Sequence, residues 1–111
     1  MSPITTHVLD TSRGRPAAGV PVALERAVDS GWQLLGRGTT DGDGRVSDLL
    51  SSAPEDGRYR LTFDTGAYFR AIGEAAFYPE VSVTFVVGRS EEHYHVPLLL
   101  SPFGYTTYRG S

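Results

Sequence analysis

Short segments in which apolar and polar side chains alternate are the feature that most limits the folds open to this chain. In residues 58–63, Tyr59, Leu61 and Phe63 alternate with polar residues, which is the period of a half-buried β-strand. Comparable segments recur with turn residues between them, at residues 4–10, 20–28, 32–40, 45–46, 81–87, 93–101 and 105–108. Many short strands joined by turns predict an all-β fold of seven to eight strands.

Two segments between the strands carry specific local signals. Asp29-Ser30-Gly31 predicts a hairpin turn between residues 20–28 and 32–40. After Asp64-Thr65, a possible N-cap, the apolar residues fall at helical spacing, and Gly73 can close the helix. We therefore expect one short helix in an otherwise all-β chain.

Length and composition restrict the class of protein. The 111 residues match one domain of about 100 to 150 residues, so residues 1–111 are expected to form a single domain. The absence of cysteine excludes a disulfide-stapled miniprotein, and the net charge of −3 with ten scattered Lys and Arg residues predicts no nucleic-acid partner. No leader-like start or membrane-spanning apolar run is present. The expected location is the cytoplasm, without membrane attachment.

The strand predicted at residues 93–101 has two unlike faces, because side chains alternate along a strand. One face is apolar and suits the core; it comprises Tyr94, Val96, Leu98 and Leu100. The other carries His93 and His95 beside Leu99, which is too polar for a core and too apolar for a solvated surface. Such a face predicts a subunit interface with a polar site set into it.

The first and last strands predict the same kind of face. In residues 4–10, His7 and Leu9 lie opposite the inward-facing Val8. In the last strand Thr106 and Tyr108 share one parity, so Tyr108 could join the outer face beside the histidines.

Metal binding is an alternative interpretation of the histidines. His93 and His95 place two imidazoles on one strand face, and His7 could be a third zinc ligand. No cysteine is available and spacing does not locate an acidic partner, so this interpretation is the less favoured one. Residues 41–45 imitate the start of a calcium loop, but Arg45 and the later Ser52 stand where that loop needs oxygen ligands, and a glycine-containing turn explains them better.

Conventional catalytic motifs are missing from the sequence. It has no Gly-x-Ser-x-Gly elbow, no glycine-rich phosphate loop before a helix and no cysteine nucleophile. Glu91-Glu92 could act as a carboxylate pair beside the histidines, but a solvated turn is the simpler interpretation. The candidates that remain are His7, His95 and Arg45.

Six segments in order carry a resemblance to a known family. They are ITTHVLDT at 4–11, GRPA at 14–17, TDGDGR at 40–45, FYPE at 77–80, HYHVPLLLSP at 93–102 and YRGS at 108–111. In these segments the chain resembles the 5-hydroxyisourate hydrolases, whose distinguishing signature is the terminal Tyr-Arg-Gly-Ser. The related transthyretin hormone carriers share the fold but are expected to lack the histidines and this tetrapeptide.

The resemblance implies a two-sheet, transthyretin-like β-sandwich of seven to eight strands with one short helix. It also implies a homotetramer with active sites where dimers meet, and neither a metal nor an organic cofactor. The implied reaction opens the ring amide of 5-hydroxyisourate, the unstable product of urate oxidation, and yields 2-oxo-4-hydroxy-4-carboxy-5-ureidoimidazoline.

Side-chain chemistry and the resemblance together suggest roles for five residues. His7 and His95 suit acid/base work, because histidine titrates near pH 6.5, and Arg45 suits substrate binding and stabilisation of an anion. Tyr108 and Ser111 are expected to hold the substrate, as is His7. Which histidine is the base stays open, and a non-catalytic carrier or binding module is the alternative function, because a fold alone does not fix function.

Overall fold

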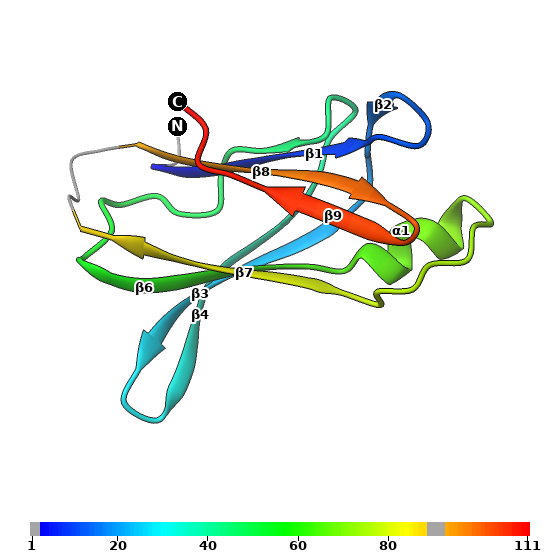
Figure 1. Ribbon diagram of the computed structural model, residues 1–111. Helices are drawn as coiled ribbons and strands as arrows, with labels where there is room; N and C mark the ends of the chain where they lie inside the picture. The colour runs from blue at the N-terminus through cyan, green and yellow to red at the C-terminus, as the bar shows by residue number, and fades with distance from the viewer. Residues whose placement is uncertain (1–2, 89–92) are drawn as a thin grey trace.

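The computed structural model describes residues 3–88 and 93–111. In this part of the chain, two β-sheets lie one above the other, and a single short helix lies at one end of the two layers (Figure 1). The all-β sandwich expected from the sequence is confirmed.

The first sheet is built around β1, the strand that carries His7. Its order is β2-β1-β8-β9, and β5 also pairs with β1. The pairing of β1 with β8 is parallel, while β2, β5 and β9 each pair antiparallel. The bounds are β1 Ile4–Asp10, β2 Arg15–Pro16, β5 Arg45–Val46, β8 Tyr94–Ser101 and β9 Gly104–Thr107.

The second sheet is antiparallel throughout, with the order β4-β3-β6-β7. Its strands are β3 Pro21–Val28, β4 Gly31–Thr39, β6 Gly57–Phe63 and β7 Val81–Val87. Val28 pairs with Gly31, so the predicted hairpin between β3 and β4 is confirmed.

The described residues form nine strands rather than seven or eight. The difference lies between the strands predicted at residues 4–10 and 20–28, where β2 pairs with the end of β1. The Asp10 carboxylate accepts hydrogen bonds from the backbone amides of Ser12 and Arg13, which closes the turn tightly enough for Arg15 to pair with Asp10. A two-residue strand of this kind has too few residues to show alternation.

The core fills the space between the two sheets. It is formed by the apolar residues of each strand that the predicted alternation turns inward. From the first sheet, Val8 and Leu98 are fully buried, and from the second Leu24, Leu61 and Phe63 are fully buried. Their neighbours of opposite parity face outward, which leaves the outer face of the first sheet available for His7 and His95.

Helix α1 (Thr65–Ala71) follows β6 as predicted. The Asp64 side chain accepts a hydrogen bond from the Ala67 amide at 3.0 Å, so Asp64 is the N-cap that the sequence suggested. Gly73, immediately after the C-cap Ile72, has a φ of 76°, which lies in the left-handed region that favours glycine. The helix buries Tyr68 and Phe69 against the sandwich.

Candidate functional site

His7, Arg45 and His95 come from three neighbouring strands and share one face of the first sheet. His7 on β1 pairs directly with Arg45 on β5. On the other side of β1, Thr5 pairs with His95 on β8, and His7 pairs with Pro97 two residues further along. Since residues two apart on a strand share a face, the three candidate side chains project from the same outer surface.

The turn before β5 positions Arg45. The Asp41 carboxylate accepts hydrogen bonds from the backbone amides of Asp43 at 2.9 Å and of Arg45 at 3.0 Å. The bond from Arg45 lowers the pKa of Asp41 most, and Asp43 with the nearby charges of Arg45 and His7 adds to it against a small opposing effect of burial. A carboxylate that stays ionised therefore holds the turn in shape.

Gly44 fixes this turn to β1. Its carbonyl accepts a hydrogen bond from the Val8 amide at 2.7 Å, and its φ of 78° is one that residues with side chains rarely adopt. A Cβ at Gly44 would lie 2.4 Å from the Val8 carbonyl oxygen. The glycine thus permits the close approach that places Arg45 opposite His7.

The ring of His7 is anchored through Nε2, which lies 2.8 Å from the carbonyl oxygen of Asp43. A carbonyl oxygen only accepts hydrogen bonds, so Nε2 of His7 carries a proton and is the donor of this hydrogen bond. The same turn that positions Arg45 therefore also selects the tautomer of His7, leaving Nδ1 for proton exchange.

His95 is half-buried, and its Nδ1 lies 2.8 Å from the Thr5 hydroxyl. Burial lowers the pKa of His95, and the positive charge of Arg45 lowers it further, as do His7 and His93 when they are protonated, while a hydrogen bond with Thr5 acts in the opposite direction. At neutral pH the ring is uncharged and can accept a proton.

A cavity of 440 Å³ opens on this face beside Arg45, His95 and Ser111. The other lining residues are Thr5, Thr6, Val46, Ser47 and His93. Of the five residues proposed from the sequence, three therefore line one cavity. His7 lies next to it through its pairing with Arg45 but is not among the described residues of its lining.

The last residues of the chain are attached to His95. The Gly110 amide donates to the His95 carbonyl oxygen at 2.8 Å, and a Cβ at Gly110 would come within 2.6 Å of His95 Cδ2. Gly110 is not among the glycines with a positive φ, so its backbone conformation does not require glycine. It is needed because the chain passes directly against the imidazole ring, and this brings Ser111 to the cavity.

Tyr108 lies near His95 but on a different cavity. It is 56% exposed, and with His95 it lines a space of 280 Å³ bounded on the other side by Val83 and Phe85 of β7. The neighbouring Arg109 places its guanidinium 4.7 Å from the centre of the Tyr94 ring. Within this chain, the structure does not bring Tyr108 to the cavity that Arg45 lines.

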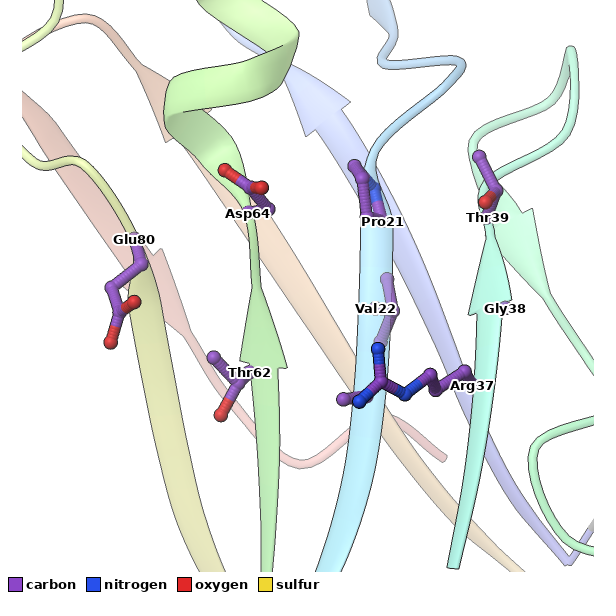
Figure 2. A pocket seen from close by; sticks show the side chains of 9 residues that line it. Pro21, Val22, Arg37, Gly38, Thr39, Thr62, Asp64 and Glu80 are labelled. Atoms are coloured by element: carbon purple, nitrogen blue, oxygen red, sulfur yellow. The ribbon is translucent and has the colours of Figure 1, made fainter. Parts of the chain in front are cut away.

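A larger cavity, of 520 Å³, lies on the second sheet (Figure 2). Arg37 extends from β4 across β3, and Asp64 and Glu80 lie on the opposite side of the cavity. Asp64 already serves as the cap of α1. The histidines of the chain lie on the first sheet or immediately before β8, so this second cavity lacks the proton-transfer groups gathered around His95.

Among residues 3–88 and 93–111, no three His, Asp or Glu side chains gather closely enough to hold a metal ion. Within the same part of the chain, no helix has the length and apolar character needed to cross a membrane. The proposed carboxylate pair, Glu91 and Glu92, lies outside the described residues.

Thr5 and the Asp43 carbonyl, which are partners of the histidines, were not predicted from the sequence. The only signal for Thr5 was its parity with His7, because a hydroxyl on the outer face becomes informative once the register of β1 with β8 is known. The Asp43 contact involves a backbone carbonyl, which residue type does not reveal.

Comparison with known proteins gives matches over nearly the whole chain. Residues 4–110 match the model of the HIUase/Transthyretin family. The chain is 49% identical over 109 residues to a 5-hydroxyisourate hydrolase of Salmonella dublin, covering 97% of this chain and 80% of that protein.

Solved structures with this fold include a 5-hydroxyisourate hydrolase and a transthyretin in complex with thyroxine. The 5-hydroxyisourate hydrolase of Klebsiella pneumoniae superposes with a TM-score of 0.87 at 37% identity, covering 97% of this chain and 92% of that one. Sea bream transthyretin in complex with thyroxine gives a TM-score of 0.92 at 33% identity, with coverage of 97% and 94%. The backbone alone therefore does not separate the two activities.

Proposed function

Since the chain belongs to the HIUase/transthyretin family, we propose that it hydrolyses 5-hydroxyisourate, the reaction for which its Salmonella relative is named. The product is 2-oxo-4-hydroxy-4-carboxy-5-ureidoimidazoline, and the reaction belongs to urate breakdown. The observation that carries the proposal is the convergence of two imidazoles and one guanidinium on a single outer face.

In the proposed reaction, His95 takes a proton from water as the water oxygen attacks the carbonyl carbon of the ring amide. An uncharged imidazole is needed for this step, and burial together with Arg45 favours that form. The negative charge that develops on the carbonyl oxygen is stabilised by Arg45, which lines the same cavity.

His7, which first takes up a proton from bulk water at Nδ1, then donates that proton to the leaving ring nitrogen as the carbon–nitrogen bond breaks. Its Nε2–H stays on the Asp43 carbonyl during this step, so the ring keeps its orientation. Ser111 lines the cavity and contacts the substrate, and Tyr108 reaches the substrate from the neighbouring cavity beside His95. None of these steps uses a metal or an organic cofactor.

A small-molecule carrier is the second candidate, because the hormone-bound transthyretin of sea bream has the same fold. A carrier has no need for titratable side chains around an arginine. The Salmonella relative, at higher identity than that carrier, is named as a hydrolase. The hydrolase therefore accounts for more of the molecule than the carrier does.

The protein is further proposed to act as a homotetramer in the cytoplasm, with its sites between subunits. Leu9, Leu99 and Thr106 form one row across β1, β8 and β9 on the same outer face as the histidines, and the two leucines are only half-buried within one chain. Covering this row with a second copy would bury the two leucines and bring the second subunit next to the cavity.

The deciding experiment follows the absorbance of freshly generated 5-hydroxyisourate with and without the protein. We expect accelerated decay that survives exhaustive dialysis against a chelator. Decay at the spontaneous rate, together with saturable binding of a small aromatic ligand, would instead favour the carrier. Loss of activity on chelation and its recovery with zinc would show that the metal-free mechanism is wrong.

A further inference from the structure

The Thr5 hydroxyl lies between two imidazole rings. Its oxygen is 2.8 Å from Nδ1 of His95 and 3.2 Å from Nε2 of His93. Thr5 is only 8% exposed, whereas His93 is exposed to solvent. A buried hydroxyl thus connects the candidate base to a second histidine at the surface.

The number of protons restricts how these three groups can bond. A threonine hydroxyl has one proton, so Thr5 can donate to only one ring and must accept from the other. If Thr5 donates to His93, then His95 carries its proton on Nδ1 and its Nε2 is free to accept another. If His93 donates to Thr5, the hydroxyl donates to His95, whose neutral form then carries its proton on Nε2.

We propose that Thr5 and His93 are positioning residues which set the tautomer of His95 and carry its excess proton to solvent. This inference rests on the proposed function for its role in turnover, with His95 acting through Nε2. In the resting enzyme His95 donates from Nδ1 to Thr5, and Thr5 donates to Nε2 of His93.

The relay moves one proton at each bond and changes no other atoms. When Nε2 of His95 takes a proton from water, the Nδ1 proton passes to the Thr5 oxygen, and the Thr5 proton passes to Nε2 of His93. His95 is then neutral again, and the positive charge resides on His93. Because His93 is exposed, its Nδ1 proton leaves to bulk water.

The charges around His95 explain why such a relay is useful. Arg45 on β5 and His7 on β1 face the ring, His93 precedes β8, and Ser111 lines the same cavity. Arg45 and burial both oppose an imidazolium at His95. Transfer of the charge to His93 places it in water, where its solvation is more favourable.

The main test replaces Thr5 with valine, which keeps the β-branched shape and removes the hydroxyl. We expect T5V to lower kcat about tenfold or more with KM within about twofold, as for loss of a group that supports acid/base transfer. Thr5→Ser retains the hydroxyl and should restore most of the turnover. Thr62→Val is the matched control, because Thr62 lies on β6 of the second sheet, where its hydroxyl lies 3.3 Å from that of Ser82.

A second readout does not depend on turnover. Nitrogen NMR of His95 in the free protein should show protonation at Nδ1 in the wild type, and a shift toward protonation at Nε2 in T5V and in His93→Phe. An unchanged His95 tautomer in both variants would overturn the relay, as would a wild-type kcat and pH profile in T5V. If the wild-type protein does not hydrolyse 5-hydroxyisourate, the proposed function fails, and the NMR result still decides the tautomer coupling. If T5V does not fold, His93→Phe supplies the same comparison.

Discussion

The Tyr68 hydroxyl donates a hydrogen bond of 2.6 Å to the Asp10 carboxylate, and both side chains are almost completely buried. The contact joins α1 to the end of β1. Burial opposes ionisation of Asp10, but hydrogen bonds from Tyr68, Ser12 and Arg13 outweigh it and lower the pKa of Asp10. Burial and the neighbouring carboxylate raise the pKa of Tyr68 to about 12. The pair therefore consists of a neutral phenol and an ionised carboxylate at neutral pH.

Tyr68→Phe should destabilise the protein by about 1.5 to 3 kcal/mol at pH 7, the usual range for a hydrogen bond to a charged group. The folded state lowers the pKa of Asp10. The stabilisation from this hydrogen bond is therefore present above pH 3.8, the ordinary pKa of Asp, and is lost as the pH falls through the folded pKa. Urea denaturation of both proteins at pH 7 and in acid provides the measurement. An equal difference in free energy of unfolding at both pH values would contradict the charged pair.

Alanine at His7, His95 or Arg45 should lower turnover about a hundredfold or more, the usual scale for an acid/base group or for one that stabilises an oxyanion. Thermal midpoints should change little, since all three side chains project from the outer face. Arg37→Ala is the matched control, because Arg37 lines the separate cavity on the second sheet (Figure 2). Wild-type turnover in all three variants would remove the proposed site.

The pH dependence of kcat/KM follows from the direction in which the pKa of His95 is shifted. Burial and then Arg45 lower the pKa of His95 from 6.5, so the acid limb of kcat/KM should lie below pH 6.5. Arg45→Gln should move this limb upward toward pH 6.5 as well as lowering the rate, whereas Arg45→Lys keeps the charge and should leave the limb near its wild-type position.

The lowered pKa of His95 also affects the free energy of unfolding. The unfolded chain protonates His95 near pH 6.5 and the folded chain only at lower pH, so the free energy of unfolding should fall as pH drops from 6.5 through the folded pKa. His95→Gln should abolish this part of the pH dependence. Denaturant titrations between neutral and mildly acidic pH would detect it.

Much of the fold was predictable because its signals are local. Alternation predicted β1 and β7 to the residue, and Asp64 with Gly73 predicted both ends of α1. The contacts of the candidate site were not predictable in this way, because they depend on pairing between segments far apart in the sequence. Thr5 meets His95 only because β1 and β8 pair in parallel and in one register, which depends on packing between segments 90 residues apart. Likewise, the need for glycine at position 110 comes from the nearness of a ring that the local sequence does not reveal.

Deletion of residues 108–111 should cost activity far more than stability. The segment contributes no residue to the buried core, yet Gly110 packs against His95 and Ser111 lines the cavity. Turnover and the thermal midpoint of a chain ending at Thr107 should be measured together. Gly110→Val provides a finer test, because its side chain would displace the His95 ring while the chain length stays the same.

Tetramer formation should depend on the row that includes Leu9 and Leu99. Leu99→Glu places a charge in this proposed interface and should give smaller species in light scattering together with a loss of turnover. Leu34→Glu, on an exposed part of β4, is the control and should remain tetrameric. A fully active, stable monomer of the unsubstituted protein at micromolar concentration would contradict sites between subunits.

The parallel pairing of β1 with β8 also has a consequence for how the protein is made. During synthesis β1 emerges early, but its parallel neighbour follows only after both the hairpin of the second sheet and the helix. The Thr5 to His95 contact closes a loop of 90 residues, and long-range closures of this kind are slow. Until then the edge of β1 that pairs with β8 is unpaired and exposed to other nascent chains. Aggregation during expression should therefore be most sensitive to substitutions that weaken β8, even where the finished enzyme tolerates them.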